Sequence, residues 1–567
     1  METQLTYADP DLKIADHIQA SLNCHPVLAK LLVDREICDP EDAKFFLNPD
    51  FSLLRNPFDL KGIDRAVERI YTAVINKEKI FIFGDFDADG VTATSVVYEF
   101  LSMVNADLTW YIPHRVKEGY SLHPPHIDRA VEMDVDLIIT VDCGISSHEA
   151  VDAASKEDID VIITDHHEPG KDIPNALAVI NPKQKDCGSD LNYLAGVGVA
   201  FYLIMALRKY FRDKGLWEKY TEPSLAMFLD LFTIGTIGDM VPLINDNRSL
   251  CVAGMRQIKL GTRPGIKSMA HASRIDLSQL DSDDISFKIV PRINAAGRVS
   301  HARICVSHLT APTLSQAKTT AQLLDELNLK RQQIEREIVQ DIENRIAREP
   351  SLLDERMIVL WSDDWEASVL GIAASRLSRK YVCPVVLLSV SEGMATGSCR
   401  SVNQINIHEI LNENNHLFEK FGGHAMAAGL TVQTDCLELL KPALVKSLFE
   451  KYSDQDFIKT FKVDAELNLD DITIELAREI DQLRPFGTAN PEPVFLIRNL
   501  WVTSSQIIGS CHRKMILKAE SSTHQVEALH FNLSDTADLP NFYSKVLFKL
   551  KINKFKPDAV QIIIQDL

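Results

Sequence analysis

The chain has 567 residues, of which 46% are hydrophobic and 25% charged, and this composition is typical of a globular protein. It excludes a collagen-like, disordered or coiled-coil chain. The 80 acidic and 60 basic residues give a net charge of -20 at pH 7. Proteins that coat duplex DNA are usually basic, so any nucleic-acid contact must use local patches or metals held by carboxylates. At roughly 100–200 residues per domain, this length predicts about three or four domains.

Nothing in the sequence is typical of a membrane or secreted protein. No stretch reaches the roughly 18 apolar residues of a membrane span, and the N-terminus lacks the basic start and apolar run of a secretory signal. The ten cysteines are scattered, with no C-x-x-C pair that would indicate a zinc knuckle. Such thiols are typical of a reducing cytoplasm. We expect a cytoplasmic protein without a membrane partner, and a monomer because no dimerisation segment is evident.

The first half of the chain has the pattern of an α/β domain. Residues 1–70 mix helix and loop patterns, and we expect an N-terminal extension that packs on the domain that follows, residues 71–311. The expected strands are residues 79–84, 107–112, 136–141 and 160–164, and the expected helices are residues 91–103, 126–133, 147–155 and several within 194–271. Short apolar strands that alternate with helices form a parallel sheet covered on both faces.

A long helix and two smaller domains follow. Apolar residues recur at steps of three, four and seven over residues 314–348, which predicts one helix of about 50 Å. A helix buried in a core would show the same pattern, but the sequence changes character on its two sides, so we expect a connector over residues 312–350. Residues 351–452 predict a second α/β unit with strands at 357–361 and 384–388, and the β-rich residues 453–567 predict a small barrel.

Three aspartates, Asp85, Asp87 and Asp89, stand at alternate positions between the first strand and the first helix of the sheet. Carboxylates this close repel one another unless a cation neutralises them, and the carboxyl end of a parallel strand is where open α/β sheets bind ligands. The alternative is an exposed acidic turn. A calcium-binding EF-hand loop is disfavoured, because the Glu at loop position 12 is missing.

The same placement occurs twice more. Asp142 follows the third expected strand, and Asp165, His166 and His167 follow the fourth, so we expect all of them at one edge of the sheet. Alone, Asp142 could cap a helix and either histidine could be buried in a core. Asp239 ends a later apolar helix. Such ligands suit Mn²⁺, Mg²⁺ or Zn²⁺, and they suffice for two divalent ions about 3.5–4 Å apart, an arrangement suited to in-line attack on phosphorus.

These ordered segments resemble the four motifs of the DHH phosphoesterase superfamily, and residues 421–429 resemble the Gly-Gly-His motif of its companion DHHA1 domain. The segments 181–184, 292–298 and 484–487 narrow the resemblance to the bacterial RecJ family of single-strand-specific exonucleases, over nearly the whole chain. The resemblance implies an α/β fold: a DHH parallel-sheet catalytic domain, a long connecting helix, a smaller α/β DHHA1 domain and a C-terminal OB-fold β-barrel.

The resemblance also implies a catalytic centre with two Mn²⁺ or Mg²⁺ ions. Its metal ligands are Asp87, Asp89, Asp142, His166 and Asp239, with Asp142 as the expected bridge. Its catalytic or supporting residues are Asp85, Asp165, His167, Asn294 and Arg298. We expect His167 to orient the scissile phosphate or donate to it. Asn294 and Arg298 are expected in a glycine-containing loop, from which Arg298 could clamp phosphate with two hydrogen bonds or be an ordinary surface arginine.

Substrate contacts are implied outside the metal centre. By resemblance, Arg115 together with Ser398 and Arg400 binds the 5′ phosphate, and His424 meets substrate from the second domain; loop structure and a glycine turn are the alternatives. In the barrel, Lys549, Lys551 and Lys554 alternate with the aromatic residues Tyr543, Phe548 and Phe555 in a stretch without acids. Basic and aromatic side chains suit single-stranded nucleic acid, although a strand could equally bury the aromatic rings.

Two departures from the family pattern are local. Glu366 and Ser368 stand where the family usually has histidine and glycine, which puts one second-domain contact in doubt, and Ala489 replaces a usual glycine.

The resemblance implies a single-stranded-DNA-specific 5′→3′ exonuclease that releases 5′-mononucleotides in DNA repair and recombination. Its implied partners are single-stranded DNA, single-strand-binding protein and a RecQ-type helicase. The first alternative is a DHH phosphoesterase for short oligoribonucleotides, nucleoside bisphosphates or cyclic dinucleotides, but such enzymes usually lack the connector and the barrel. The second is a non-enzymatic replication subunit, but such relatives lose metal ligands that are present here.

Overall fold

The computed structural model describes residues 3–509, 511–533, 539–554 and 556–566. Its contacts divide the chain into two compact units. The larger unit comprises Tyr7–Asp325 and Val463–Leu567, and the smaller unit comprises Glu326–Lys462 with the first six residues. Among the described residues, no helix combines the length and the apolar character needed to cross a bilayer.

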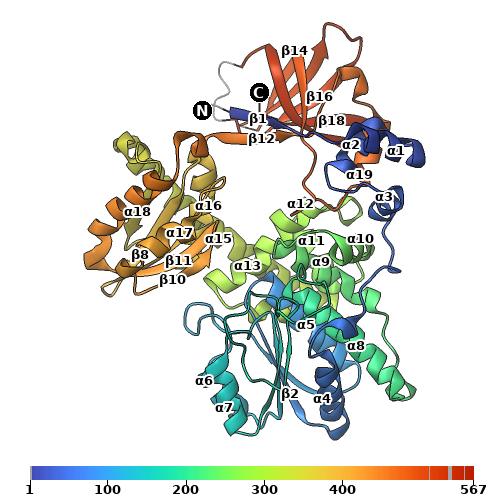
Figure 1. Ribbon diagram of the computed structural model, residues 1–567, viewed down its shortest axis with the longest axis vertical. Coiled ribbons are helices and arrows are strands. Elements are labelled where there is room, and N and C mark those ends of the chain that lie inside the picture. Colours follow the sequence, from blue (N-terminus) through green and yellow to red (C-terminus); the bar gives the residue numbers. More distant parts are fainter. Residues whose placement is uncertain (1–2, 510, 534–538, 555, 567) are drawn as a thin grey trace. The chain divides into compact units, whose positions relative to one another are not determined.

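The larger unit contains the predicted parallel sheet (Figure 1). Its order is β3-β2-β4-β5-β6, and every neighbouring pair is parallel. The strands are β2 (Lys79–Gly84), β3 (Asp107–Tyr111), β4 (Leu137–Val141), β5 (Asp160–Thr164) and β6 (Ala178–Ile180). The first four lie where the sequence predicts them. The fifth was not predicted, because three residues are too few to show a periodic pattern.

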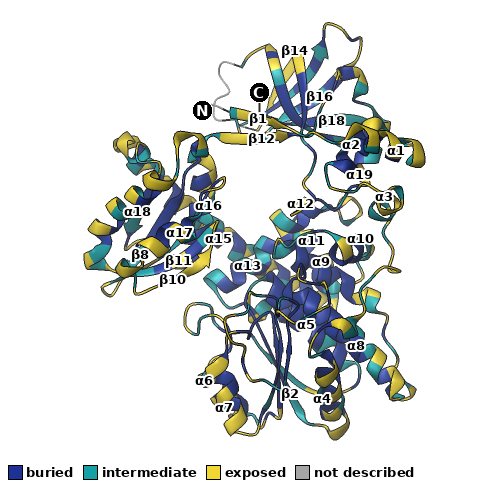
Figure 2. Cartoon of the chain, viewed as in Figure 1, coloured by how far each residue is buried: buried dark blue, intermediate teal, exposed yellow. Residues whose placement is uncertain are grey.

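Helices cover both faces of this sheet. The faces are covered by α6 (Pro124–Glu132) and α7 (His148–Lys156) on one side, and by α4 (Ile63–Asn76), α5 (Ala88–Ser102) and α8 (Gly196–Asp213) on the other. Phe81 and Phe83 pack in the core beneath α6 and α7. The strands are buried while the outer surfaces of α6 and α7 are exposed (Figure 2). Burial on both faces explains why these strands are continuous apolar runs.

The order of the strands fixes where a ligand can bind. From β2 the chain passes through α5 to β3 on one side, and from β4 it passes through α7 to β5 on the other. Adjacent strands whose connections diverge leave a crevice at their carboxyl ends, which is the usual ligand site of open α/β sheets. Here that crevice lies between the end of β2 at Gly84 and the end of β4 at Val141.

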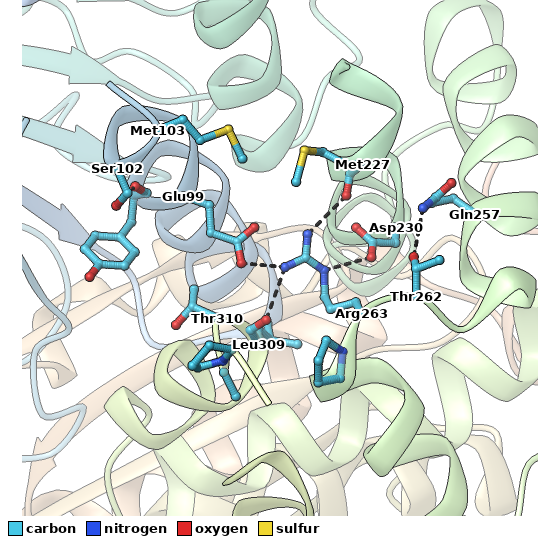
Figure 3. A pocket seen from close by; sticks show the side chains of 14 residues that line it. Glu99, Ser102, Met103, Met227, Asp230, Gln257, Thr262, Arg263, Leu309 and Thr310 are labelled. Atoms are coloured by element: carbon cyan, nitrogen blue, oxygen red, sulfur yellow. Dashed lines mark hydrogen bonds and ion pairs between the residues drawn. The ribbon is translucent and has the colours of Figure 1, made fainter. Parts of the chain in front are cut away.

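Further helices pack around α5 in the larger unit. They are α9 (Leu229–Gly238), α10 (Asn245–Leu260), α11 (Pro264–Ala272), α13 (Val290–Val299) and α14 (Arg303–Leu309). Arg263, just before α11, donates to Asp230 of α9 at 2.7 Å and to Glu99 of α5 at 2.6 Å. These contacts border a cavity of about 700 Å³ (Figure 3). One buried guanidinium therefore joins the ends of α5 and α9 that are opposite to Asp89 and Asp239.

The long helix α15 spans Leu314–Arg348, as the sequence predicts. It leads to a mixed sheet of order β10-β11-β9-β8-β7 in the smaller unit. The strands are β7 (Ile358–Ser362), β8 (Val385–Ser391), β9 (Met394–Arg400), β10 (Lys420–His424) and β11 (Ala427–Gln433), and the helices α16 (Ala367–Tyr381), α17 (Ile407–Glu413) and α18 (Leu437–Lys451) pack with them. Only β7 and β8 are parallel.

The C-terminal part of the larger unit is the predicted barrel. It consists mainly of β14 (Phe495–Ile508), β15 (His512–Ala519), β16 (Gln525–His530), β17 (Phe542–Asn553) and β18 (Lys556–Asp566). The order is β14-β15-β16-β18-β17, and β17 pairs again with β14, which closes the sheet. Closure satisfies the hydrogen-bonding groups of the edge strands. The predicted fold class, with a parallel-sheet domain, a long helix, a smaller α/β unit and a barrel, is confirmed.

The N-terminal segment packs differently from the expectation. Its helices α1 (Leu12–Leu22), α2 (Pro26–Val33) and α3 (Pro40–Leu47) share one hydrophobic core with the barrel rather than with the parallel sheet. Leu28 and Leu32 of α2 belong to the same core as Leu476 and Ile480 of α19 (Ile474–Asp481). The end of the segment contacts the domain of residues 71–311 as expected: α4 packs on its sheet and on α8, and Arg55 N donates to Asp246 at 2.8 Å. Apolar faces in a sequence show that a helix is buried but not which partner buries it.

We predict that Arg263→Met lowers the free energy of unfolding by about 3–5 kcal/mol, because Glu99 and Asp230 then become buried charges without a counterion. The control is Lys209→Met, which removes an exposed pair with Asp213 and costs less than about 1 kcal/mol. Urea unfolding followed by circular dichroism measures both. Equal losses for the two variants would contradict the role of Arg263.

Candidate functional site

The three aspartates after β2 belong to a helix start rather than to a long loop. Asp87 caps α5, since its Oδ1 accepts hydrogen bonds from the backbone N–H groups of Asp89 at 2.9 Å and Gly90 at 3.1 Å. This cap starts the helix at Ala88, three residues before the predicted start. A Cβ on Gly90 would lie 2.6 Å from the carbonyl oxygen of Asp85, so only glycine permits this close turn.

Asp142 lies directly across the crevice at the end of β4. Its backbone is in the left-handed region, with φ of +60°, which costs most residues about 1–2 kcal/mol but which aspartate tolerates best after glycine and asparagine. The Asp142 N–H donates to the carbonyl of Thr164 on β5 at 2.9 Å, which holds the turn. Asp142 Oδ1 then lies 3.2 Å from His166 Nε2.

The start of α8 holds a second carboxylate. The backbone N–H groups of Gly196 and Val197 donate to Asp89 at 2.6 and 2.8 Å. Free N–H groups at a helix N-terminus bind anions well. A Cβ on Gly196 would lie only 2.4 Å from Asp142 Oδ1, so this position requires glycine. Gly196 thereby lets one helix end approach both Asp89 and Asp142.

The side chains expected to bind metal lie in one cluster. His166 Nε2 is 3.2, 3.6 and 3.8 Å from carboxylate oxygens of Asp142, Asp239 and Asp89. Three sets of potential ligand atoms each lie within 4.8 Å of one another: Asp142, His166 and His167; Asp89, His166 and Asp239; and Asp85, Asp87 and Asp142. Asp142 and His166 each belong to two sets. The three groups therefore adjoin one another through shared ligands, and the cluster offers enough ligand atoms for the two cations expected from the sequence.

The carboxylates of this cluster cannot all be ionised without a cation. Burial and the charge of Asp87 raise the pKa of Asp85 well above its usual value and that of Asp89 to about 7. Burial and the charge of Asp89 also raise the pKa of Asp142 strongly and that of Asp239 to about 8. Like charges in a buried site disfavour one another. A pair of divalent cations would remove this penalty.

The hydrogen bonds of the cluster fit metal ions as well. Within the described part of the chain, Asp85 Oδ1, Asp142 Oδ1 and both ring nitrogens of His166 are buried without a hydrogen-bond partner. Burial and the neighbouring charge of His167 lower the pKa of His166 to about 3, so its ring is neutral and can offer a nitrogen lone pair. Buried polar atoms without partners are costly unless a ligand satisfies them. These atoms are the ones that cations between the carboxylates would contact.

Asp165 has a supporting place. Its Oδ1 accepts hydrogen bonds from His166 N at 2.7 Å, His167 N at 3.0 Å and His167 Nδ1 at 2.8 Å, and its Oδ2 accepts from Ile145 N at 2.9 Å. Burial favours the neutral forms of both Asp165 and His167, but the hydrogen bonds and the opposite charges of the two side chains outweigh burial. The pKa of Asp165 is therefore lowered, and that of His167 is raised to about 9. Asp165 thus fixes the orientation of both histidines.

Arg115, Asn294 and Arg298 lie around the same loop of the larger unit. The Arg115 guanidinium is 4.8 Å from the centre of the Phe86 ring. Asn294 Oδ1 accepts from Ala88 N at 2.8 Å, which holds the start of α5. Asn294 and Arg298 lie on α13 rather than in the predicted loop. Gly297 suggested that loop, but it lies within the helix, where a Cβ would come 2.9 Å from the carbonyl oxygen of Phe86.

Ser398, Arg400 and His424 share one face of the sheet in the smaller unit. Ser398 and Arg400 lie on β9, and His424 and Arg400 both stand opposite Ala427 of β11 in the antiparallel registers. Side chains directly opposite point to the same face. A Cβ on Gly371 of α16 would lie 2.8 Å from the Arg400 guanidinium. Ser398, Arg400 and His424, for which a loop and a glycine turn were the alternatives, lie in strands, and β10 with β11 forms a hairpin.

The two family departures also have structural correlates. Glu366 is the N-cap residue of α16, and its carboxylate accepts a hydrogen bond from the Ser368 hydroxyl at 3.3 Å. Negative charge at a helix N-terminus is favourable. Ala489 has a φ of +60°, so the family glycine would be less strained there. The turn is kept, since Gly487 and Asn490 exchange backbone hydrogen bonds.

The barrel lysines are already paired with carboxylates. Lys549 and Lys551 lie 3.1 and 3.2 Å from Glu492, and Lys554 lies 3.5 Å from Asp281. These acids lie outside the lysine-rich stretch in the sequence, so the absence of acids within that stretch did not predict the pairing. Of the aromatic residues between the lysines, Tyr543 and Phe548 are buried in the barrel core, as one of the two alternatives predicts, and Phe555 lies outside the described residues.

Sequence reasoning missed other residues. Trp501 and Phe542 stand opposite each other on β14 and β17, remain 45% and 39% exposed, and have ring centres 4.7 Å apart. Tyr120 Oη lies 3.1 Å from His167 Nδ1. Gly196 could have been found, because the segment Gly196-Val197-Gly198 opens a helical pattern after a strand unit. Trp501 and Tyr120 have no local sequence signal, since their neighbours come from other segments.

Family models match three parts of the chain. The DHH family N-terminal domain matches residues 79–236, the DHHA1 domain residues 354–451 and the RecJ OB domain residues 463–566. The single-stranded-DNA-specific exonuclease RecJ of Bacillus subtilis (strain 168) is 34% identical over 98% of this chain and 70% of its own length. The chain belongs to the RecJ family. The crystal structure of RecJ from Thermus thermophilus in complex with Mn²⁺ matches this RecJ-family chain over its whole length and 79% of its own, with a TM-score of 0.82 at 27% identity. The corresponding Mg²⁺ complex also matches the whole chain and 78% of its own, with a TM-score of 0.76 at 25% identity.

We predict that Gly196→Ala weakens Mn²⁺ binding by roughly 10- to 100-fold, because the added methyl group displaces Asp142 and the backbone N–H groups that hold Asp89. Isothermal titration calorimetry on metal-free protein measures the affinity. Gly188→Ala is the matched control, since a Cβ there meets no atom within 4 Å. An unchanged affinity in Gly196→Ala would show that this close approach does not position the ligands.

Proposed function

We propose that this chain is a metal-dependent single-stranded-DNA-specific exonuclease that degrades strands from 5′ to 3′ and releases 5′-mononucleotides. The observation that carries the proposal is the cluster of carboxylates and histidines at the sheet crevice, with three overlapping groups of potential cation ligands that are linked through Asp142 and His166. Membership of the RecJ family, whose curated member from Bacillus subtilis is a single-stranded-DNA-specific exonuclease, supports the choice of substrate. The Mn²⁺ and Mg²⁺ complexes of the Thermus relative support the choice of cofactor.

The residues of the centre have distinct tasks. Asp87, Asp89, Asp142, His166 and Asp239 would hold the ions, with Asp85 beside them. Bound divalent cations supply an activated water and neutralise charge on the phosphate oxygens. Asp165 holds the His167 ring through Nδ1, which leaves Nε2 for a phosphate oxygen or the leaving group. Asn294 keeps the start of α5 in place through Ala88.

We assign phosphate contacts outside the metal centre to groups in each unit separately. In the larger unit, we assign this role to Arg115, which is held over Phe86, and to Arg298 of α13. In the smaller unit, we assign it to Ser398 and Arg400 on β9, with His424 on the same face of the sheet. A hydroxyl and a planar guanidinium fork are good chemistry for a terminal phosphate. These assignments make recognition of the 5′ end part of the proposal.

The cellular setting follows from the family resemblance. We propose a role in DNA repair and recombination, with single-strand-binding protein and a RecQ-type helicase as partners of a monomeric enzyme. A cytoplasmic location agrees with ten cysteines that are all in the free thiol form. No feature of the described residues favours the small-substrate phosphoesterases over an exonuclease, so that alternative enters only as an outcome of the test.

We predict that, with Mn²⁺, the protein releases the 5′ label of a free single strand as a mononucleotide. A 3′-labelled strand, a 5′-blocked strand, a blunt duplex and a dinucleotide complete the assay. Asp142→Ala should lower the rate by about 1000-fold or more, because two sets of ligand atoms lose a member. Asp152→Ala, an exposed position on α7, is the control. Cleavage of the dinucleotide alone would contradict the proposal, as would near-normal turnover by Asp142→Ala.

We further propose that the barrel holds the strand through Trp501 and Phe542. Base stacking on aromatic rings tolerates every sequence, and Lys518 stands opposite Trp501 on β15, where it can meet phosphate. Both rings are exposed, whereas Tyr543 and Phe548 are not. The lysines predicted from the sequence, Lys549, Lys551 and Lys554, remain a competing surface, although binding DNA would require them to leave their carboxylate partners.

Binding measurements separate the two surfaces. In an Asp142→Ala background, we predict that Trp501→Ala weakens the binding of a fluorescent oligonucleotide by about 1–3 kcal/mol per stacked base, a roughly 5- to 150-fold rise in Kd. Ile507→Ala, an exposed aliphatic residue on the same strand, is the control and should bind normally. A larger loss for the pair Lys549→Gln and Lys551→Gln than for Trp501→Ala would assign the contact to the lysines instead.

A further inference from the structure

The segment between β3 and α6 brings a tyrosine to the metal centre. Its fold depends on Glu118, which accepts hydrogen bonds from the Tyr111 hydroxyl at 2.6 Å and from His114 N at 2.5 Å. At its far end, His123 bonds to the carbonyl of Tyr120 at 2.9 Å. Tyr120 then lies edge-on to the His167 ring, with ring centres 5.5 Å apart. Its hydroxyl oxygen is 3.1 Å from His167 Nδ1.

The hydrogen of this hydroxyl is not accepted by Nδ1 of His167. Asp165 receives four donors, so it is a carboxylate that can only accept. The 2.8 Å contact from His167 Nδ1 to Asp165 therefore requires a hydrogen on Nδ1, and that nitrogen has no lone pair for Tyr120. The remaining acceptors within reach, the carbonyl of Asp142 and Nε2 of His167, both lie at 3.5 Å, the long limit of a hydrogen bond.

The hydroxyl is thus a weakly engaged donor beside the residues that would hold the cations. Its oxygen lies next to His167, to which we assign a contact with the scissile phosphate. It also lies next to the backbone of Asp142, which belongs to two groups of potential metal ligands. Tyr120 as a whole residue is 39% exposed, so a substrate can approach it. A donor placed before the reaction, where charge develops on oxygen, stabilises the transition state without reorganisation.

We propose that Tyr120 is a catalytic residue that donates a hydrogen bond to a non-bridging oxygen of the scissile phosphate. This inference rests on the proposed function and adds a contact to it. Tyr120 stabilises charge on the phosphate from the side of His167, whereas the cations lie among the carboxylates. No covalent bond to tyrosine forms, and its proton stays on the phenol. The role therefore requires the hydroxyl and not only the ring.

The test is Tyr120→Phe, which keeps the ring against His167 and removes one oxygen. We expect kcat on a 5′-phosphorylated single strand with Mn²⁺ to fall by roughly 10- to 100-fold. KM and the Mn²⁺ affinity should each change by less than about twofold, and the melting temperature by less than about 2 °C. The reason is that the hydroxyl makes no contact shorter than 3.1 Å with another described residue. Tyr98→Phe is the matched control, since Tyr98 lies on α5 toward the end that is far from Asp89.

Phosphorothioate substrates separate a phosphate contact from a purely structural role. Sulfur in place of a non-bridging oxygen accepts hydrogen bonds weakly. The stereoisomer with sulfur at the position that Tyr120 contacts should therefore slow the wild-type protein more than Tyr120→Phe, which has already lost this contact. Equal thio effects in both proteins, a normal kcat, or a parallel loss of Mn²⁺ binding would each overturn the inference. If the wild-type protein leaves single strands intact, the proposed function fails, and the same comparison on bis(p-nitrophenyl) phosphate still decides the role of Tyr120. Absence of wild-type activity on both substrates would refute both.

Discussion

Repulsion between the carboxylates at the end of the parallel sheet is the constraint that the surrounding structure of the larger unit has to satisfy. Parallel strands bring their carboxyl ends to one edge, so acids that are far apart in the sequence meet in one largely buried crevice. Part of the resulting charge is met by backbone N–H groups: those of α5 on Asp87, those of α8 on Asp89 and those around Asp165. The Oδ1 atoms of Asp142 and Asp85 have no hydrogen-bond partner among the described residues. The arrangement is stable as a set of ions only when cations complete it.

The surrounding architecture serves to hold these charges in place. Helices α5 and α9 carry acids at their ends nearest the crevice, while Arg263 bonds both helices at the opposite ends. Glycine occurs at Gly90 and Gly196, where a side chain would collide with the acids themselves. Asp142 occupies a left-handed conformation that the β4–β5 ladder sustains. Rigid elements, rather than flexible loops, therefore set the geometry of the centre.

The parts that the sequence predicted well are those with local causes. Buried strands such as β2 are continuous apolar runs, the long helix α15 has clear periodicity, and the acids follow the strands directly. The misses have causes that are distant in sequence. Strands β9 to β11 are rich in glycine and alanine and have little strand propensity, so their pairing partners define them. The counterions of Lys549 and Lys554 come from other segments, and Gly297 serves helix packing rather than a turn.

The shared core of the N-terminal helices and the barrel has a consequence during synthesis. Leu467 follows Ala43 by 424 residues, yet both belong to one core. At roughly 5–20 residues per second, a ribosome needs about 20–85 s to make the intervening chain. Throughout that interval α1 to α3 can contact one another but lack the barrel side chains that complete their core, while the parallel sheet can already fold. The N-terminal helices therefore reach their native packing only once the barrel, the last part of this chain, has been made.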